Sequence, residues 1–326
     1  MMKLPLLFTL AAAALAADGF PQAEISNGSV RAKLYLPDAR QGYYRATRFD
    51  WSGQIASLEF QGHNYFGQWF DRYDANRNDS ILGPVEEFLS GGLGLGYNGV
   101  KTGESFVKIG VGALRKPEER AFSQFKTYEI ADPGKWTVNQ FPDRVEFTHE
   151  LPATAGYSYL YKKTVRLTAG KPQLVLEHSL RNTGTKPIET SVYEHNFYVI
   201  DGQPAGPDFT VKFPFTVRAA ADLRGLAEIR GTQLTFLKEL QKGQTVHSAL
   251  EGYGKTAKDY DIRVENALAR SGVRQTSDRP LAKLDFWAIR STVCPEAYID
   301  MRIEPGNEFT WRIVYDFYTL PESGAK

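Results

Sequence analysis

The stretch YLYKKTVRLTAGKPQLVLEHSLRN, residues 159–182, contains two segments of alternating polarity with a turn between them. Apolar residues recur at every second position of each segment, which is the period of a half-buried β-strand. The intervening LTAGKP (167–172) contains Gly and Pro, which favour tight turns. The stretch therefore predicts two antiparallel strands joined as a hairpin.

The same period recurs along the rest of the chain. Helix-compatible stretches are few and brief and do not alternate with these segments, which argues against a βαβ fold. We therefore predict an all-β fold of large stacked antiparallel sheets. No linker, composition shift or repeat divides the chain, so a single domain over residues 17–326 is expected. Further segments with this period are 29–36, 54–60, 105–114, 144–151, 210–217, 260–266, 297–304 and 309–318.

The first 16 residues, MMKLPLLFTLAAAALA, have the pattern of a cleaved secretory signal. Lys3 precedes an apolar run from Leu4 to Leu15, and small residues surround the expected cleavage point. The run is too short to span a bilayer comfortably, and no later stretch approaches the length of a membrane helix. We therefore expect a mature protein that is periplasmic or secreted and has no membrane span.

The overall composition narrows the classes of partner. The chain has 39 basic and 38 acidic residues, giving a formal charge of +1, so it lacks the concentrated positive charge that nucleic acids require. Cys294 is the only cysteine, which excludes an intrachain disulfide and a zinc site built on several thiolates.

SVYEHNFYVIDG, residues 191–202, places a charged and a titratable residue inside an apolar strand pattern. Since strand side chains alternate between faces, His195 should share a face with Tyr193 and Phe197, while Glu194 and Asn196 face the other way. Such a histidine is also compatible with a core residue bonded to a backbone carbonyl, so a second signal is needed.

Glu296 supplies that second signal. It follows Pro295 at the entry to a predicted strand and does not sit in a solvated turn as Glu304 and Glu308 do. An ordinary strand-entry glutamate facing water is the alternative. Together with His195, Glu296 would form an acid/base pair.

Three segments resemble the aldose 1-epimerase (galactose mutarotase-like) superfamily. EHNFYVIDG (194–202) resembles its His-x-Tyr-Phe strand, and VCPEAYIDMRIEPGNEFTWRIVYDFY (293–318) resembles its C-terminal segment. RFDWSGQIASLEFQGHNYFGQW (48–69) is similar to its opening hairpin. The resemblance covers most of residues 40–318 and implies a galactose mutarotase-like β-supersandwich.

The resemblance also implies chemical roles. His195 would be the general acid that protonates the ring oxygen of a sugar, and Glu296 the general base that takes the proton of the anomeric hydroxyl. An imidazole and a carboxylate can move two protons without a metal or cofactor, so none is predicted. We expect both side chains to line one cleft, separated by about the width of a sugar ring.

Several further residues are predicted to bind the carbohydrate. DYDIRVEN (259–266) resembles the family's Asp-bearing strand, which would assign that role to Asp261. Trp287 is the tryptophan expected to stack on a sugar face. Arg45 and Arg48 carry guanidinium groups suited to adjacent hydroxyls, although solvated arginines are the alternative.

The main departure from the family concerns a second histidine, carried in an upstream HG turn by many members. Residues 82–99, LGPVEEFLSGGLGLGYNG, have Glu86 and Glu87 there and no histidine. A carboxylate accepts hydrogen bonds from sugar hydroxyls but cannot donate as an imidazolium does, so both glutamates are predicted to bind substrate.

This departure leaves two alternatives open. One is a carbohydrate-binding protein without catalysis, and the other is a polysaccharide lyase using Tyr193 or Tyr198 as its base. DANRNDS (74–80) also has oxygen-bearing residues at alternate positions, as calcium loops do. However, Asp79 replaces the expected Gly and Val85 the bidentate Glu, so no metal site is predicted there.

Overall fold

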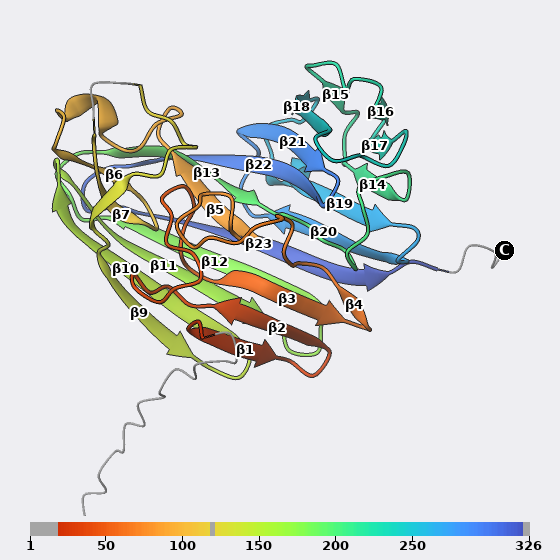
Figure 1. Ribbon diagram of the computed structural model, residues 1–326, viewed down its shortest axis with the longest axis horizontal. Coiled ribbons are helices and arrows are strands. Elements are labelled where there is room, and N and C mark those ends of the chain that lie inside the picture. The colour runs from red at the N-terminus through yellow and green to blue at the C-terminus, as the bar shows by residue number, and fades with distance from the viewer. Residues whose placement is uncertain (1–18, 118–120, 322–326) are drawn as a thin grey trace, which may run out of the picture.

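The computed structural model describes residues 19–117 and 121–321, and their regular structure is almost entirely β (Figure 1). The predicted all-β class is therefore confirmed. The predicted signal, residues 1–16, lies outside the described residues. The strands are β1 (Gln22–Ser26), β2 (Val30–Tyr35), β3 (Gln54–Phe60), β4 (His63–Asn64), β5 (Val85–Leu89), β6 (Ser105–Lys108), β7 (Gly112–Arg115), β8 (Glu129–Asp132), β9 (Lys135–Gln140), β10 (Arg144–Thr154), β11 (Tyr157–Leu167), β12 (Gln173–Asn182), β13 (Ile188–His195), β14 (Phe209–Lys212), β15 (Arg218–Ala219), β16 (Ala227–Arg230), β17 (Gln233–Phe236), β18 (Thr245–Glu251), β19 (Asp261–Asn266), β20 (Ser271–Ser277), β21 (Lys283–Ile289), β22 (Thr292–Ile303) and β23 (Glu308–Thr319).

In the part of the chain that the structure describes, the helical content consists of two 3-10 turns, η1 (Tyr97–Gly99) and η2 (Ala257–Asp259). Among the described residues, none of the helical segments is long and apolar enough to cross a membrane. The regular backbone hydrogen bonds are therefore mostly those between paired strands. The named strands pair in antiparallel orientation.

Two large sheets form the body of the molecule. One has ten strands in the order β16-β17-β14-β19-β20-β23-β12-β11-β10-β9, and the other has six in the order β15-β18-β21-β22-β13-β5. A four-stranded sheet (β1 to β4) and a three-stranded sheet (β6 to β8) complete the described structure. The hairpin predicted over residues 159–182 is β11 paired with β12, with Tyr159 opposite Asn182.

The two large sheets pack face to face. Every second side chain along their strands points into the space between them. Phe88 of β5 lies edge-on against Trp311 of β23, with ring centroids 6.1 Å apart, and also contacts Tyr161 of β11. Val192 of β13 is opposite Phe88 and equally buried. Burial of such side chains is the main favourable contribution to folding.

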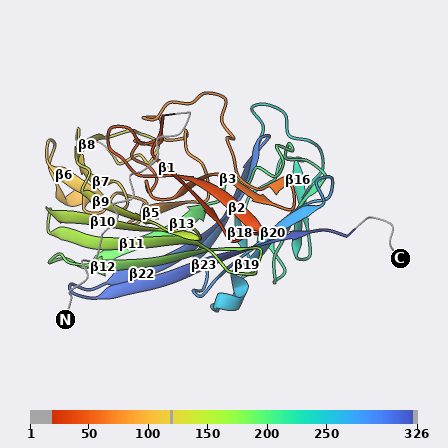
Figure 2. The ribbon, with the colours of Figure 1, turned by 90° about the horizontal axis from the view of Figure 1, so that it is seen from below.

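The opposite face of the six-stranded sheet is covered by loops from the N-terminal third of the chain. Figure 2 shows these loops along one side of the strands. A second cluster of buried apolar residues, including Phe49, Ile81 and Phe197, holds the loops against the sheet. The candidate site lies between this outer face and the loops.

Candidate active site

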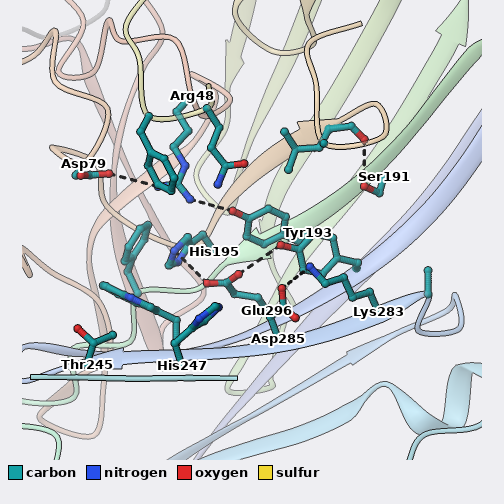
Figure 3. A pocket seen from close by; sticks show the side chains of 18 of the residues that line it. Arg48, Asp79, Ser191, Tyr193, His195, Thr245, His247, Lys283, Asp285 and Glu296 are labelled. Carbon is teal, nitrogen blue, oxygen red and sulfur yellow. Dashed lines mark hydrogen bonds and ion pairs between the residues drawn. The ribbon is translucent and has the colours of Figure 1, made fainter. Parts of the chain in front are cut away.

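Alternation along β13 decides which side chains reach the site. Tyr193 and His195 line a cavity of about 900 Å³ on the outer face (Figure 3). Phe197, just beyond the strand, lines it too. Glu194 and Asn196 point to the inner side, where Tyr315 of β23 donates a hydrogen bond of 2.9 Å to the Asn196 side chain. The predicted distribution of faces along this strand is confirmed.

His195 and Glu296 meet on the cavity floor. Nε2 of His195 lies 3.3 Å from Oε1 of Glu296, and both residues line the cavity. The predicted separation of about a sugar ring's width is wrong. The two strands are neighbours in the sheet, so side chains at matching positions on one face come into direct contact.

The electrostatics of the pair follow from its burial. Burial raises the pKa of Glu296 to about 8; Arg48 opposes this rise, and Asp285 adds to it. Burial, followed by the charge of Arg48, lowers the pKa of His195 well below its ordinary value. At neutral pH the pair therefore holds one proton, which resides on Glu296.

Aromatic rings form the walls around the pair. Phe197 stacks on the His195 ring at 3.7 Å between centroids, and Trp69 stacks on Phe197 at 4.5 Å. The Trp287 ring lies 5.5 Å from His195 and nearly perpendicular to it. Phe197 adopts φ 43°, a left-handed conformation that non-glycine residues seldom take, so the chain turns sharply after His195. Trp287 thus lies where the sequence predicted, at the cavity wall.

Arg48 also lines the cavity, where two buried groups, Glu87 and Tyr193, and the partly exposed Asp79 fix its guanidinium. Nε donates to Glu87 at 2.9 Å, Nη2 to the Tyr193 hydroxyl at 3.3 Å and Nη1 to Asp79 at 3.3 Å. Glu87 is fully buried and also accepts from the Tyr193 hydroxyl at 2.5 Å. The prediction that Glu87 binds sugar is therefore wrong, because this carboxylate is committed to holding Arg48 and Tyr193.

Glu86 lies on the inner side of the sheet, and its prediction as a sugar ligand is also wrong. Its carboxylate accepts from Nζ of Lys163 at 2.5 Å and pairs with Nε2 of His178 at 2.6 Å, all three side chains being sealed from solvent. Glu86 is opposite Glu194 in the register of β5 and β13, so both carboxylates share this face.

The inner cluster also groups three side chains that carry possible ligand atoms for a metal. Within the described ranges, Glu86, His178 and Glu194 form the group whose ligand atoms lie within 4.8 Å of one another. The ammonium of Lys163 already supplies positive charge to Glu86. Geometry therefore assigns this cluster to the interior of the sandwich, away from the cavity.

Two other predicted ligands lie outside the cavity lining. The Arg45 guanidinium donates to the Gly42 carbonyl at 2.9 Å, within its own loop. Asp261, at the start of β19, forms a bidentate pair with Arg274 at 2.7 Å on the ten-stranded sheet. Neither residue is among those that border the cavity, so this cavity brings neither of these two predicted ligands together with His195 and Glu296.

In the calcium-like loop at residues 74–80, the side-chain oxygens of Asp74 and Asn78 accept from backbone amides. Oδ1 of Asp74 accepts the Asn76 amide at 2.9 Å, and the buried Asn78 accepts the Thr47 amide at 3.1 Å. These contacts close the loop as turn hydrogen bonds do.

Sequence reasoning missed three residues of the cavity floor: Lys283 and Asp285 on β21, the strand that carries Trp287, and Tyr298 on β22. Lys283 and Asp285 form an ion pair of 2.5 Å, and Asp285 is opposite Glu296 in the register. Tyr298 donates to Glu296 at 3.5 Å. The signal was present, because Lys283, Asp285 and Trp287 alternate on one face of LAKLDFWAI (281–289).

Comparison with known proteins supports the architecture. No family model and no curated protein matches the chain. Solved structures do match. A galactose mutarotase-like protein from Clostridium acetobutylicum is 14% identical over 93% of this chain and 96% of its own, with a TM-score of 0.58. A homologue of aldose epimerase from C. elegans is 15% identical over 92% of this chain and 99% of its own, with a TM-score of 0.57. A galactose mutarotase related enzyme from Lactobacillus acidophilus matches at 14% identity, 92% and 98% coverage and TM-score 0.55.

Proposed function

We propose that this chain, which has the galactose mutarotase-like fold, is an exported protein that interconverts the anomers of a sugar or sugar derivative. The observation that carries the proposal is the contact between His195 and Glu296 on the cavity floor. An imidazole and a carboxylate that share one proton in a cleft are suited to general acid/base chemistry.

The short separation suits this reaction. The ring oxygen and the anomeric hydroxyl are bonded to the same carbon, so two groups in contact can each reach one of them. For His195 to act as the acid, the single proton first passes from Glu296 across the 3.3 Å contact. This transfer needs no intervening group.

The proton steps then balance. His195 gives its proton to the ring oxygen while Glu296 takes the proton of the anomeric hydroxyl, the carbon to ring-oxygen bond breaks and an aldehyde forms. After the aldehyde rotates, the freed hydroxyl attacks it, returning its proton to His195, while Glu296 protonates the carbonyl oxygen. The pair then has the proton on His195, as it did after the first transfer, and its return to Glu296 across the same contact restores the resting state, so no external reactant is consumed.

Polarimetry across hexoses, pentoses, uronic acids and sugar phosphates tests the proposal. We expect the wild-type protein to accelerate mutarotation of at least one of these sugars. Binding of a sugar by calorimetry without acceleration of any of them would instead favour the carbohydrate-binding alternative. That alternative gains some support from residues 82–99, whose Glu86 and Glu87 are both committed to buried partners.

The lyase alternative has less support. Tyr193 donates its hydroxyl proton to Glu87, and burial raises the pKa of Tyr193 well above its ordinary value, which opposes a role as base. Tyr198 is buried and donates to Gln275 at 2.6 Å. Neither hydroxyl is suited to accept a proton from a substrate.

The export part of the proposal rests on residues 1–16. Cleavage after Ala16 would start the mature protein at Ala17. N-terminal sequencing of protein isolated from its native host should find that start. Recovery of a chain that begins at Met1 or Met2 would contradict it.

A further inference from the structure

The cavity floor is wider than one sugar ring. It extends across four neighbouring strands, β13, β22, β21 and β18, from His195 at one side to His247 at the other. Three strand intervals separate these residues, or about 14 Å at the usual spacing between paired strands. A single pyranose with its anomeric carbon at His195 and Glu296 therefore ends before β18.

The β18 side of the cavity carries hydrogen-bonding groups that the fold does not use. Thr245, His247 and Arg224 line the cavity there, and their side chains form no hydrogen bond or ion pair with another residue in the described part of the chain. Figure 3 shows Thr245 and His247 next to each other at the lower left, below His195. Such groups are available to a ligand.

Arg224 lies in a turn with an unusual backbone conformation. It adopts φ 58°, a left-handed conformation that is unfavourable for arginine, in a turn whose amide is held by Asp222 at 2.9 Å. The turn between β15 and β16 carries Arg224, which lines the cavity wall.

Trp287 connects the two ends of the cavity. It is opposite His247 in the pairing of β18 with β21, and its ring lies 5.5 Å from His195. An indole offers an apolar surface to the faces of sugar rings together with one hydrogen-bond donor. A chain of linked sugars could therefore remain in contact with protein from His195 to β18.

We propose that Thr245, His247 and Arg224 form a second sugar subsite, so that the protein takes the reducing end of an uncharged oligosaccharide. The inference rests on the proposed function, which places the reducing end at His195 and Glu296. The charges favour an uncharged ligand, because Lys283 pairs with Asp285, and Asp222 lines the wall beside Arg224.

The test compares anomer exchange of matched mono- and disaccharides: glucose with maltose and cellobiose, galactose with galactobiose, and xylose with xylobiose. Wild-type protein should have a higher kcat/KM for one of the disaccharides than for its monosaccharide. The double variant Thr245→Ala/His247→Ala should reduce that ratio about tenfold, as expected for the loss of one or two hydrogen bonds.

Glu251→Ala is the matched control. Glu251 lies on β18 on the same face as His247, pairs with Arg218 at 3.7 Å and does not border the cavity. This variant should keep the wild-type ratio of kcat/KM for the disaccharide to kcat/KM for the monosaccharide. An equal kcat/KM for disaccharide and monosaccharide in wild-type protein, or the same ratio in the double variant, would overturn the inference.

Calorimetry with the same sugars separates this inference from the proposed function. If no sugar exchanges anomers, the proposed function fails, but tighter binding of a disaccharide than of its monosaccharide, weakened by the double variant, still supports the subsite. Equal affinities, or no binding of any of these sugars, overturn it.

Discussion

At the scale of single residues, the account depends on where one proton resides. Burial disfavours charge on both His195 and Glu296, so it raises the pKa of the acid and lowers that of the base. The pair therefore carries one proton over a wide range of pH. An acid/base pair is active only in that state, because one member must give a proton while the other accepts one.

The first prediction is the pH dependence of kcat/KM for anomer exchange. Above about pH 8, Glu296 loses the proton that the pair shares. At a pH well below the ordinary pKa of histidine, His195 also becomes protonated and the pair then holds two protons. The profile should be bell-shaped, with an alkaline limb near pH 8. Asp285→Asn removes a carboxylate that raises the pKa of Glu296, so it should move this limb to lower pH. An alkaline limb at the same pH as in the wild type, or at a higher pH, would contradict the assignment of this limb to Glu296.

The sequence predicted the two residues of this pair, and Arg48 and Trp287 in the same cavity, but not the positions of Glu86 and Glu87. Alternation along residues 191–198 was enough to place His195 and Tyr193 on one face. Glu86 and Glu87 were both assigned to the sugar, although adjacent strand residues must point to opposite sides of a sheet. Their partners, Lys163 and Arg48, are distant in the chain, and no local pattern indicates which strands become neighbours.

At the scale of elements, β5 and β13 separate the cavity from the interior. Phe88 and Val192 face the ten-stranded sheet, while the neighbouring Glu87 and Tyr193 face the loops and cavity. The prediction of alternating strands was sufficient for the fold class. The position of Asp261 could not be predicted in this way, because it depends on β19 joining the ten-stranded sheet rather than the six-stranded one.

The second prediction concerns the packing of β5. Phe88→Ala removes a buried ring that contacts Tyr161 and Trp311, and should reduce the free energy of unfolding by about 3–5 kcal/mol. Urea denaturation measures this change. Leu268→Ala, at a position with 64% exposure, is the control and should change it by less than about 0.5 kcal/mol. Equal effects of the two variants would contradict the packing described.

At the scale of the whole molecule, the two large sheets enclose charged groups as well as apolar ones. Asp50, Glu86 and Glu194 lie around Lys163, and burial is the largest influence on the pKa of each carboxyl. Lys163 keeps Glu86 ionised, with a pKa below its ordinary value, whereas Glu194 remains protonated because its pKa is raised. The buried ammonium of Lys163 therefore stabilises the negative charge enclosed between the two sheets.

The third prediction is that Lys163→Met destabilises the protein by about 3–5 kcal/mol, because it leaves a buried carboxylate without its partner. Chemical denaturation at pH 7 measures the loss. Lys242→Met, which removes an exposed lysine paired with Asp71, should leave the denaturation midpoint nearly unchanged. A Lys163→Met protein as stable as wild type would contradict the inter-sheet pair.

The central claim is that His195 and Glu296 exchange anomers together, and saturation-transfer NMR measures that exchange directly. With a sugar that the wild-type protein mutarotates, His195→Asn and Glu296→Gln should each reduce the exchange rate by roughly a hundredfold or more, because each removes one proton-transfer partner. Calorimetry should show that both variants still bind the sugar. Exchange at the wild-type rate in either variant would contradict the claim.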